Sequence, residues 1–181
     1  MASGRPAHRL IEVDDLRTAA QRRYGVGMDG NTVSVERVIK APPDTIFALL
    51  ADAGKHASFD GSDSVNHATQ SSVPLSKGST FGMAMRGRKE TLFIPYRTNN
   101  TVIEYEPDRR IAWQTYGMGG LVGGRIWRYE LSPAEGGTLV RETWDVSEDK
   151  QKPLITRGSV PQQTADGMRA TLDRIATLLE G

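Results

Sequence analysis

The chain has 181 residues, of which 38% are hydrophobic, and this size and composition suffice for one domain with a single core. Its 23 basic and 22 acidic side chains give a net charge of +1, a balance that indicates neither a nucleic-acid-binding protein nor a membrane-surface protein. Cysteine is absent, which excludes disulfides, thiolate metal sites and a cysteine nucleophile. With three histidines far apart in sequence, we predict no metal site, and nothing indicates another cofactor.

Targeting segments and common catalytic motifs are not evident. No apolar run approaches the roughly 18 residues of a membrane span, and MASGRPAHRL lacks the apolar segment of a signal peptide. We therefore expect a cytoplasmic protein without stable membrane insertion. The usual sequence signatures of phosphate, dinucleotide and serine-hydrolase sites do not occur either, so none of these functions is predicted.

Residues 1–31 are predicted to be an N-terminal extension of a domain that spans residues 32–181. The segment RLIEVDDLRTAAQRRYGVGMDG is highly charged and ends in glycine-rich sequence. It predicts a short helix over residues 14–24, followed by a loop. Both a partly mobile tail and a functional lid or interface are compatible with this composition.

The next segment predicts a strand followed by short helices. The valine-rich run NTVSVERVIK is typical of a strand, and the prolines at positions 42 and 43 end it because proline cannot donate a backbone hydrogen bond. Helical spacing of the apolar residues that follow predicts a helix from residue 43 or 44 to about Gly54. KHASFDG suits a single helical turn, and His56 and His67 are expected at the surface.

The middle of the chain alternates between apolar and polar residues, as β-strands do. Including a weaker strand around residues 63–72, we expect about seven strands joined mainly by short connections. The clearest are STFGMAMRG, RTNNTVIEYEP, RRIAWQTY, GGRIWRYELSP and GTLVRETWDV. The turn PAEGG between the last two is typical of a hairpin, so the sheet is predicted to be largely antiparallel.

Two loops have a composition that allows a functional role. MRGRKE, residues 85–90, contains three basic side chains and suits either a solvated turn or a cavity-mouth site for a carboxylate or phosphate. YGMGGLVGG, residues 116–124, is rich in glycine and suits either an ordinary hairpin loop or a gate over a pocket.

The last segment predicts a helix of about twenty residues with an apolar stripe. The stripe consists of Ala165, Met168, Leu172, Ile175 and Leu179. Short helices, a run of antiparallel strands and one long terminal helix form an α+β pattern, in which one face of a curved sheet packs on that helix. Because a strongly twisted sheet cannot contact a helix along its whole length, this geometry permits an internal cavity.

The order of these elements resembles the SRPBCC superfamily, which includes START lipid-transfer domains, birch-pollen-allergen-like proteins and the polyketide cyclase/dehydrase-like branch. The resembling segments are VERVIKAPPDTIFALLADAGKHASFD, NNTVIEYEPDRRIAWQT and GGRIWRYELSPAEGGTLVRETWDVS, followed by the long helix. One departure is Phe59, which stands where many members have a tryptophan. The resemblance implies a helix-grip fold, in which the sheet wraps the terminal helix and encloses a pocket for a hydrophobic small molecule. It does not imply one activity, because the superfamily contains carriers, sensors, cyclases, oxygenase domains and chaperone activators.

Glu142 stands out because its strand places a carboxylate on an apolar face. Alternation in GTLVRETWDV puts Glu142 on the same side as Val140 and Trp144, and that side is expected to be buried. Burial of an unpaired charge costs several kcal/mol. Glu142 must therefore be paired, protonated, or in contact with a cavity that holds water or a ligand.

Three interpretations of Glu142 remain open. A simple hairpin register pairs Trp127 with Glu142 and places Arg125 diagonally across from it, so Arg125, or alternatively Arg97, would pair with the carboxylate and steady the cavity wall. In a functional interpretation, apolar surroundings raise the pKa of Glu142, which then exchanges a proton with a bound carbonyl compound. In the third, the face assignment is wrong and Glu142 is exposed.

The predicted ligand-binding residues share the concave face of the sheet or the stripe of the long helix. They are Met83, Tyr105, Trp113, Arg125, Trp127, Tyr129, Glu142, Trp144 and Met168. Inward aromatic residues suit a plain core as well as a ligand wall. In a pocket, Tyr105 and Tyr129 would supply hydroxyl groups that orient a phenol or keto group.

We carry three functional hypotheses. The first is binding of a hydrophobic small molecule, aromatic, polyketide-like or lipid, in an internal cavity. The second is a cyclase or dehydratase without metal or cofactor, in which Glu142 or Tyr129 acts as the acid or base. The third is an interaction protein similar to the chaperone activators, with residues 1–31 or MRGRKE as its surface. The sequence leaves open whether the protein is an enzyme, which ligand it binds, and whether it is a monomer or a weak dimer.

Overall fold

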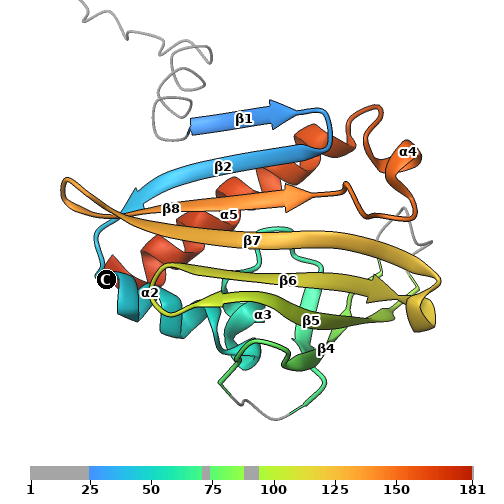
Figure 1. Cartoon of the computed structure of the whole chain (residues 1–181), viewed down its shortest axis with the longest axis horizontal. Helices are drawn as coiled ribbons and strands as arrows, with labels where there is room; N and C mark the ends of the chain where they lie inside the picture. The colour runs from blue at the N-terminus through green and yellow to red at the C-terminus, as the bar shows by residue number, and fades with distance from the viewer. Residues whose placement is uncertain (1–24, 71–73, 88–93, 181) are drawn as a thin grey trace, which may run out of the picture.

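One curved antiparallel sheet organises the part of the chain that the computed structural model describes, residues 25–70, 74–87 and 94–180 (Figure 1). Its eight strands are β1 (Gly25–Asp29), β2 (Thr32–Ile39), β3 (Val65–Ala68), β4 (Thr80–Met85), β5 (Tyr96–Glu106), β6 (Arg110–Gly117), β7 (Val122–Ala134) and β8 (Gly137–Asp145). Their order across the sheet is β1-β2-β8-β7-β6-β5-β4-β3. The antiparallel α+β fold is confirmed, with one more strand than expected. The additional strand is β1, which lies within the predicted extension and pairs with β2.

Short helices occupy the connection between β2 and β3, as the sequence predicts. They are α2 (Pro43–Leu50), the 3-10 helix η1 (Ala53–Lys55) and α3 (His56–Phe59). Pro43 begins α2, where the missing N–H of proline costs no helical hydrogen bond. A 3-10 turn, η3 (Met118–Gly120), connects β6 to β7, and α4 (Lys152–Ile155) precedes the terminal helix α5 (Val160–Glu180).

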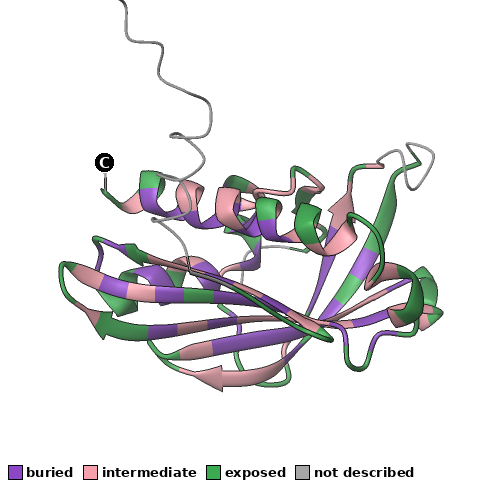
Figure 2. Ribbon diagram, turned by 90° about the horizontal axis from the view of Figure 1, so that it is seen from above, coloured by how far each residue is buried: buried purple, intermediate pink, exposed green. Residues whose placement is uncertain are grey.

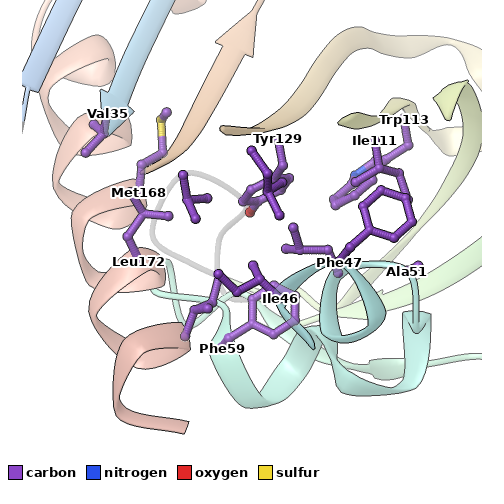
Figure 3. Close-up of a cluster of buried hydrophobic side chains, with 14 of the residues drawn as sticks. Val35, Ile46, Phe47, Ala51, Phe59, Ile111, Trp113, Tyr129, Met168 and Leu172 are labelled. Atoms are coloured by element: carbon purple, nitrogen blue, oxygen red, sulfur yellow. The ribbon is translucent and has the colours of Figure 1, made fainter. Parts of the chain in front are cut away.

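Helix α5 lies along the concave face of the sheet, and its buried residues face the strands (Figure 2). Four of the five residues in the predicted apolar stripe are buried, and Leu179 is half-buried against the same core. Across the sheet, Val35, Glu142, Tyr129 and Ile111 lie opposite one another on β2, β8, β7 and β6. This row and α5 enclose the hydrophobic core together with α2 and α3 (Figure 3), which is the expected helix-grip arrangement.

The convex face of the sheet carries charged side chains of alternating sign. Neighbouring strands β2, β8, β7, β6 and β5 present a row that consists of Glu36, Arg141, Glu130, Arg110 and Glu106. Arg141 donates to Glu36 at 2.8 Å, and Arg110 pairs with Glu106. No helix of the described residues covers this face, and such a face favours charged residues because their charges stay hydrated.

The β7–β8 hairpin has a different register from the one predicted. Trp127 lies opposite Trp144, and Glu142 lies opposite Tyr129, so the expected pairing of Trp127 with Glu142 is wrong by two residues. The turn consists of residues 135 and 136, where Gly136 has a φ of 83° that glycine adopts without strain. This turn lies one residue later than the prediction requires, and a shift of one turn residue changes the pairing by two.

Candidate functional site

Most of the predicted ligand-binding residues lie on the inner face of the sheet or on the facing side of α5. Met83, Trp113, Tyr129, Trp144 and Met168 are buried in one hydrophobic cluster, and Tyr105 and Trp127 pack against it half-buried. The ring of Trp113 lies 5.6 Å from that of Tyr129, centroid to centroid, and Figure 3 shows Tyr129 near the middle of the cluster with Trp113 to one side of it. The inward orientation of the aromatic positions is therefore observed in the structure.

Glu142 and Tyr129 form the polar centre of this apolar interior. Only 3% of Glu142 is exposed, and its neighbour on β2 is the fully buried Val35. The hydroxyl of Tyr129 donates a hydrogen bond of 2.8 Å to Oε1 of Glu142. The other carboxyl oxygen, Oε2, has no hydrogen-bond partner, and it is the single buried side-chain polar atom of the described residues in this condition.

The surroundings of Glu142 keep its carboxyl group protonated at neutral pH. Burial raises the pKa of Glu142 from 4.5 to about 8, an effect that the hydrogen bond from Tyr129 opposes and the nearby charge of Asp60 reinforces. Burial also raises the pKa of Tyr129, and the charge of Glu142 adds to this effect. The pair is therefore neutral near pH 7. Because Tyr129 donates to Oε1, the carboxyl proton belongs on Oε2, where it can be donated to a hydrogen-bond acceptor.

Arg125 is not the partner of Glu142, contrary to one interpretation of the sequence. Its Nε donates to Oδ2 of Asp149 at 2.9 Å, and the side chain of Asp149 is fully buried. Close packing of the two segments brings this pair together, because a Cβ at Gly124 would lie 2.4 Å from the carbonyl oxygen of Glu148. The ion pair between Arg125 and Asp149 thus connects the beginning of β7 with the segment that follows β8. Arg97, the alternative partner, lies exposed on β5.

His56 is buried, so its predicted surface position is wrong. Its ring stacks on Trp113 with centroids 4.8 Å apart and contacts Phe81 edge-on. Its Nε2 lies 2.9 Å from the carbonyl oxygen of Leu50, and burial lowers the pKa of His56 to about 4. The sequence does contain one indication that His56 is buried. Its spacing from the apolar Phe59 places both residues on one side of a helical turn.

Two hollows of the described chain lie away from this interior. One, of about 380 Å³, is bordered by charged residues of the convex face, among them Arg109, Arg110 and Arg141. The other, of about 310 Å³, lies beside β5 and includes Tyr105, whose ring also contacts Phe47 edge-on at 5.2 Å. Neither hollow is lined by Glu142, Tyr129 or a tryptophan. The internal cavity therefore stays a prediction.

Some predictions fall on parts of the chain that the structure does not describe. The predicted helix over residues 14–24 lies outside the described residues, as do residues 88–90 of MRGRKE. His67 is exposed on β3, as expected. Within the described ranges, no group of three histidine or acidic side chains is arranged to hold a metal ion, and no helix is long and apolar enough to cross a membrane.

Comparisons with known proteins place this arrangement in a family. Residues 31–180 match the family described as polyketide cyclase/dehydrase and lipid transport. A curated relative, the uncharacterized protein Rv0088 of Mycobacterium tuberculosis, is 31% identical over 135 residues, which are 72% of this chain and 53% of the relative. The chain thus spans about half the length of that protein.

Solved structures share the fold at low sequence identity. A protein from Rhodobacter sphaeroides is 16% identical with a TM-score of 0.65, over 86% of this chain and 96% of its own. DynU16, from the dynemicin biosynthetic locus, is 18% identical with a TM-score of 0.58, over 83% and 47% of the two chains. An AHSA1-like protein from Aeromonas hydrophila is 22% identical with a TM-score of 0.57, over 82% and 92%. At these identities, the likeness shows the fold alone.

Proposed function

Because the chain belongs to the family described as polyketide cyclase/dehydrase and lipid transport, we propose that it binds a hydrophobic small molecule between α5 and the inner face of the sheet. The observation that carries this proposal is Oε2 of Glu142, a buried polar atom without a partner. An unpaired buried group of this kind costs about 1–3 kcal/mol, which a suitable ligand atom would recover. The free energy of binding would otherwise come from contact with the surrounding apolar and aromatic side chains.

The chemistry of the carboxyl group indicates what the ligand must offer. A protonated Glu142 donates one hydrogen bond from Oε2, so the matching ligand atom is an acceptor such as a carbonyl or phenol oxygen. The rings of Trp113 and Trp144 on the same face favour a flat or aromatic partner over a polar one. Aromatic ketones, polyketide-like molecules and lipids with a carbonyl group fit this description.

Intrinsic tryptophan fluorescence tests the binding proposal directly, because all three tryptophans contact the core cluster. The protein is titrated with fatty acids, flavonoids, sterols and aromatic polyketide mimics. Saturable quenching by one chemical class is the expected result. Glu142→Ala should weaken that binding, whereas Glu130→Ala, a change on the convex face of the neighbouring strand, should not. A flat response to every compound would contradict the proposal.

A second candidate function is catalysis of ring closure or loss of water, and the neutral carboxyl group beside Tyr129 favours it. In ring closure, Glu142 would donate its proton to a ligand carbonyl oxygen while an enol carbon of the same ligand bonds to the carbonyl carbon, and the enol O–H proton would return to the carboxylate. In dehydration, the proton would go to a leaving hydroxyl, which departs as water, and the resulting carboxylate would take a proton from the adjacent carbon as the double bond forms. Such chemistry requires confinement and one weak acid.

Turnover and binding of the same variant separate these two functions. Glu142→Gln retains the size of the side chain and a hydrogen-bond donor but has no proton to transfer. It should bind ligand and lose turnover of a polyketide-like substrate. Turnover equal to that of the wild type would remove Glu142 from the mechanism, while quenching without turnover in either protein would favour a binding protein.

The chaperone-activator hypothesis and the cytoplasmic location remain predictions. The surfaces proposed for a protein partner, residues 1–31 and MRGRKE, are only partly described. A pull-down with the full chain that captures one stoichiometric protein, with no small-molecule requirement, would favour this hypothesis over ligand binding. Cell fractionation tests the location.

A further inference from the structure

Exposed apolar side chains gather at one end of the molecule. Among the described residues, eight large hydrophobic side chains are exposed, and five of them lie at this end: Ile94, Tyr96, Met118, Leu121 and Leu154. Leu121 and Leu154 are 75% and 73% exposed, and Met118 is 68% exposed. Single exposed apolar residues are common on soluble proteins, but a group of them marks an interaction surface.

Strand pairing and loop contacts explain why these residues share one end. Thr98 pairs with Gly117, so the beginning of β5 lies beside the end of β6 and η3. The backbone N–H of Lys150 donates to the carbonyl oxygen of Gly123 at 2.9 Å, which brings the segment after β8 to the same place. Figure 1 shows η3 and α4 at this end, opposite the C-terminus. We call residues 94–97, 117–125 and 147–157 the apolar end.

The apolar end is held in place by specific contacts. Gly123 and Gly124 both have a positive φ, and the second lies so close to the carbonyl oxygen of Glu148 that no larger residue fits. The ion pair between Arg125 and the buried Asp149 links the same two segments. The ammonium group of Lys150 also lies 5.6 Å from the ring centre of Tyr116. These contacts fix the backbone from which Met118, Leu121 and Leu154 project into solvent.

The charge of the apolar end is positive, unlike the balanced charge of the whole chain. Its three segments contain five basic residues, Arg97, Arg125, Lys150, Lys152 and Arg157, and two acidic residues, Glu148 and Asp149, for a net charge of +3. Asp149 is already paired with Arg125 inside the protein. Arg97, Lys150 and Arg157 are exposed on the same three segments as the apolar side chains.

We propose that the apolar end docks on the surface of an anionic lipid bilayer. Met118, Leu121 and Leu154 would enter the headgroup region, while the exposed basic residues contact lipid phosphates. Binding at the membrane surface needs apolar side chains and basic side chains together. The apolar side chains insert into the headgroup region, and the basic side chains are attracted to anionic lipid. Exposed apolar tips beside basic side chains on a fixed backbone meet both requirements. This docking is peripheral and does not depend on the ligand proposed for the interior.

Sedimentation of the full chain with lipid vesicles tests the docking. Vesicles of phosphatidylcholine are compared with vesicles in which part of this lipid is replaced by phosphatidylglycerol. We expect binding to the anionic vesicles and a decrease when salt is added, because salt screens the charges. Absence of binding to anionic vesicles, or equal binding to anionic and phosphatidylcholine vesicles, would overturn the proposal. The apolar end would then be a candidate surface for a protein partner instead.

Matched variants locate the docking surface. Leu121→Ser should weaken the partition onto anionic vesicles about tenfold, because it removes an apolar side chain from the headgroup region. Leu178→Ser, at a half-exposed position near the far end of α5, should bind like the wild type. Likewise, Arg157→Gln should weaken binding about fivefold, and Arg109→Gln, in the turn between β5 and β6, should have no effect. Equal losses in the matched variants would refute the assignment of this end. All four positions are exposed, so folding should not be affected.

Discussion

Replacement of Glu142 by glutamine should change how the stability of the protein depends on pH. The pKa of Glu142 is raised from 4.5 to about 8 in the folded state. Between these values, the folded protein keeps the proton and the unfolded chain releases it. Stability from this group is thus fully present below pH 4.5 and is lost as the pH rises to about 8. Glutamine does not titrate, so the variant lacks this loss.

The expected change in the free energy of unfolding follows from the pKa shift of Glu142. Each pH unit between 4.5 and about 8 lowers the free energy of unfolding by about 1.4 kcal/mol through Glu142. His56 acts in the opposite direction, because its pKa is lowered from 6.5 to about 4, and its contribution is lost as the pH falls through this range. The two effects offset each other from pH 4.5 to 6.5. Above pH 6.5 Glu142 acts alone, and it lowers the stability by about 2 kcal/mol by pH 8.

Urea unfolding across this pH range measures the effect. The quantity to compare is the free energy of unfolding of Glu142→Gln minus that of the wild type, because other groups cancel in the difference. It should become more positive from pH 5 to pH 8. Glu148→Gln, at an exposed position, provides the control and should give a much smaller change. A difference for Glu142→Gln that is the same at pH 5 and pH 8 would refute the argument.

Four further substitutions test the geometry of the site and its supports. Tyr129→Phe removes the hydrogen bond that lowers the pKa of the neighbouring carboxyl, so the pH-dependent loss of stability should still begin near pH 4.5 but continue to higher pH in the same urea titrations. Asp149→Ala removes the carboxylate partner of the partly buried Arg125 and should cost about 1.5–3 kcal/mol in urea unfolding, unlike Asp166→Ala at an exposed position. Gly61→Ala places a Cβ 2.2 Å from a backbone nitrogen of α5 and should lower the free energy of unfolding by about 1–3 kcal/mol. Gly167→Ala, inside α5 with its nearest contact at 3.7 Å, should raise the thermal midpoint, and a lower one would contradict the packing described.

The elements with strong periodicity were predictable from the sequence, and those that depend on a neighbour were not. The stripe of α5 and the alternation in β6, β7 and β8 are local patterns, so they identify both the elements and their buried faces. β1 lacks such a pattern, because GVGMD contains two glycines and one β-branched residue. It is a strand because β2 provides hydrogen-bond partners along its whole length.

In the candidate site, too, local patterns predicted some features, whereas features that depend on distant residues were missed. Burial of Glu142 follows from alternation alone, whereas its partner depends on the register of the hairpin, and therefore on which residues form the turn. The partner of Arg125 lies 24 residues further along, in a loop without periodicity, so no local pattern indicates it. Burial of His56 requires Trp113 and Phe81 from two other strands, which a single helical turn does not reveal.

The charged row on the convex face also discriminates between alternative pairings of the strands. In the native hairpin, Glu130 lies opposite Arg141. Were the hairpin to slip by two residues, to the pairing that the sequence first suggested, Arg128 would lie opposite Arg141 and Glu130 would lie opposite Leu139. Both changes are unfavourable, since like charges repel and Glu130 loses its cationic neighbour. On the inner face, Leu131, Tyr129 and Trp127 are all suited to burial, and the slip would cost the hydrogen bond between Tyr129 and Glu142. Correct alignment of the sheet is thus encoded on the side that faces water as well as in the core.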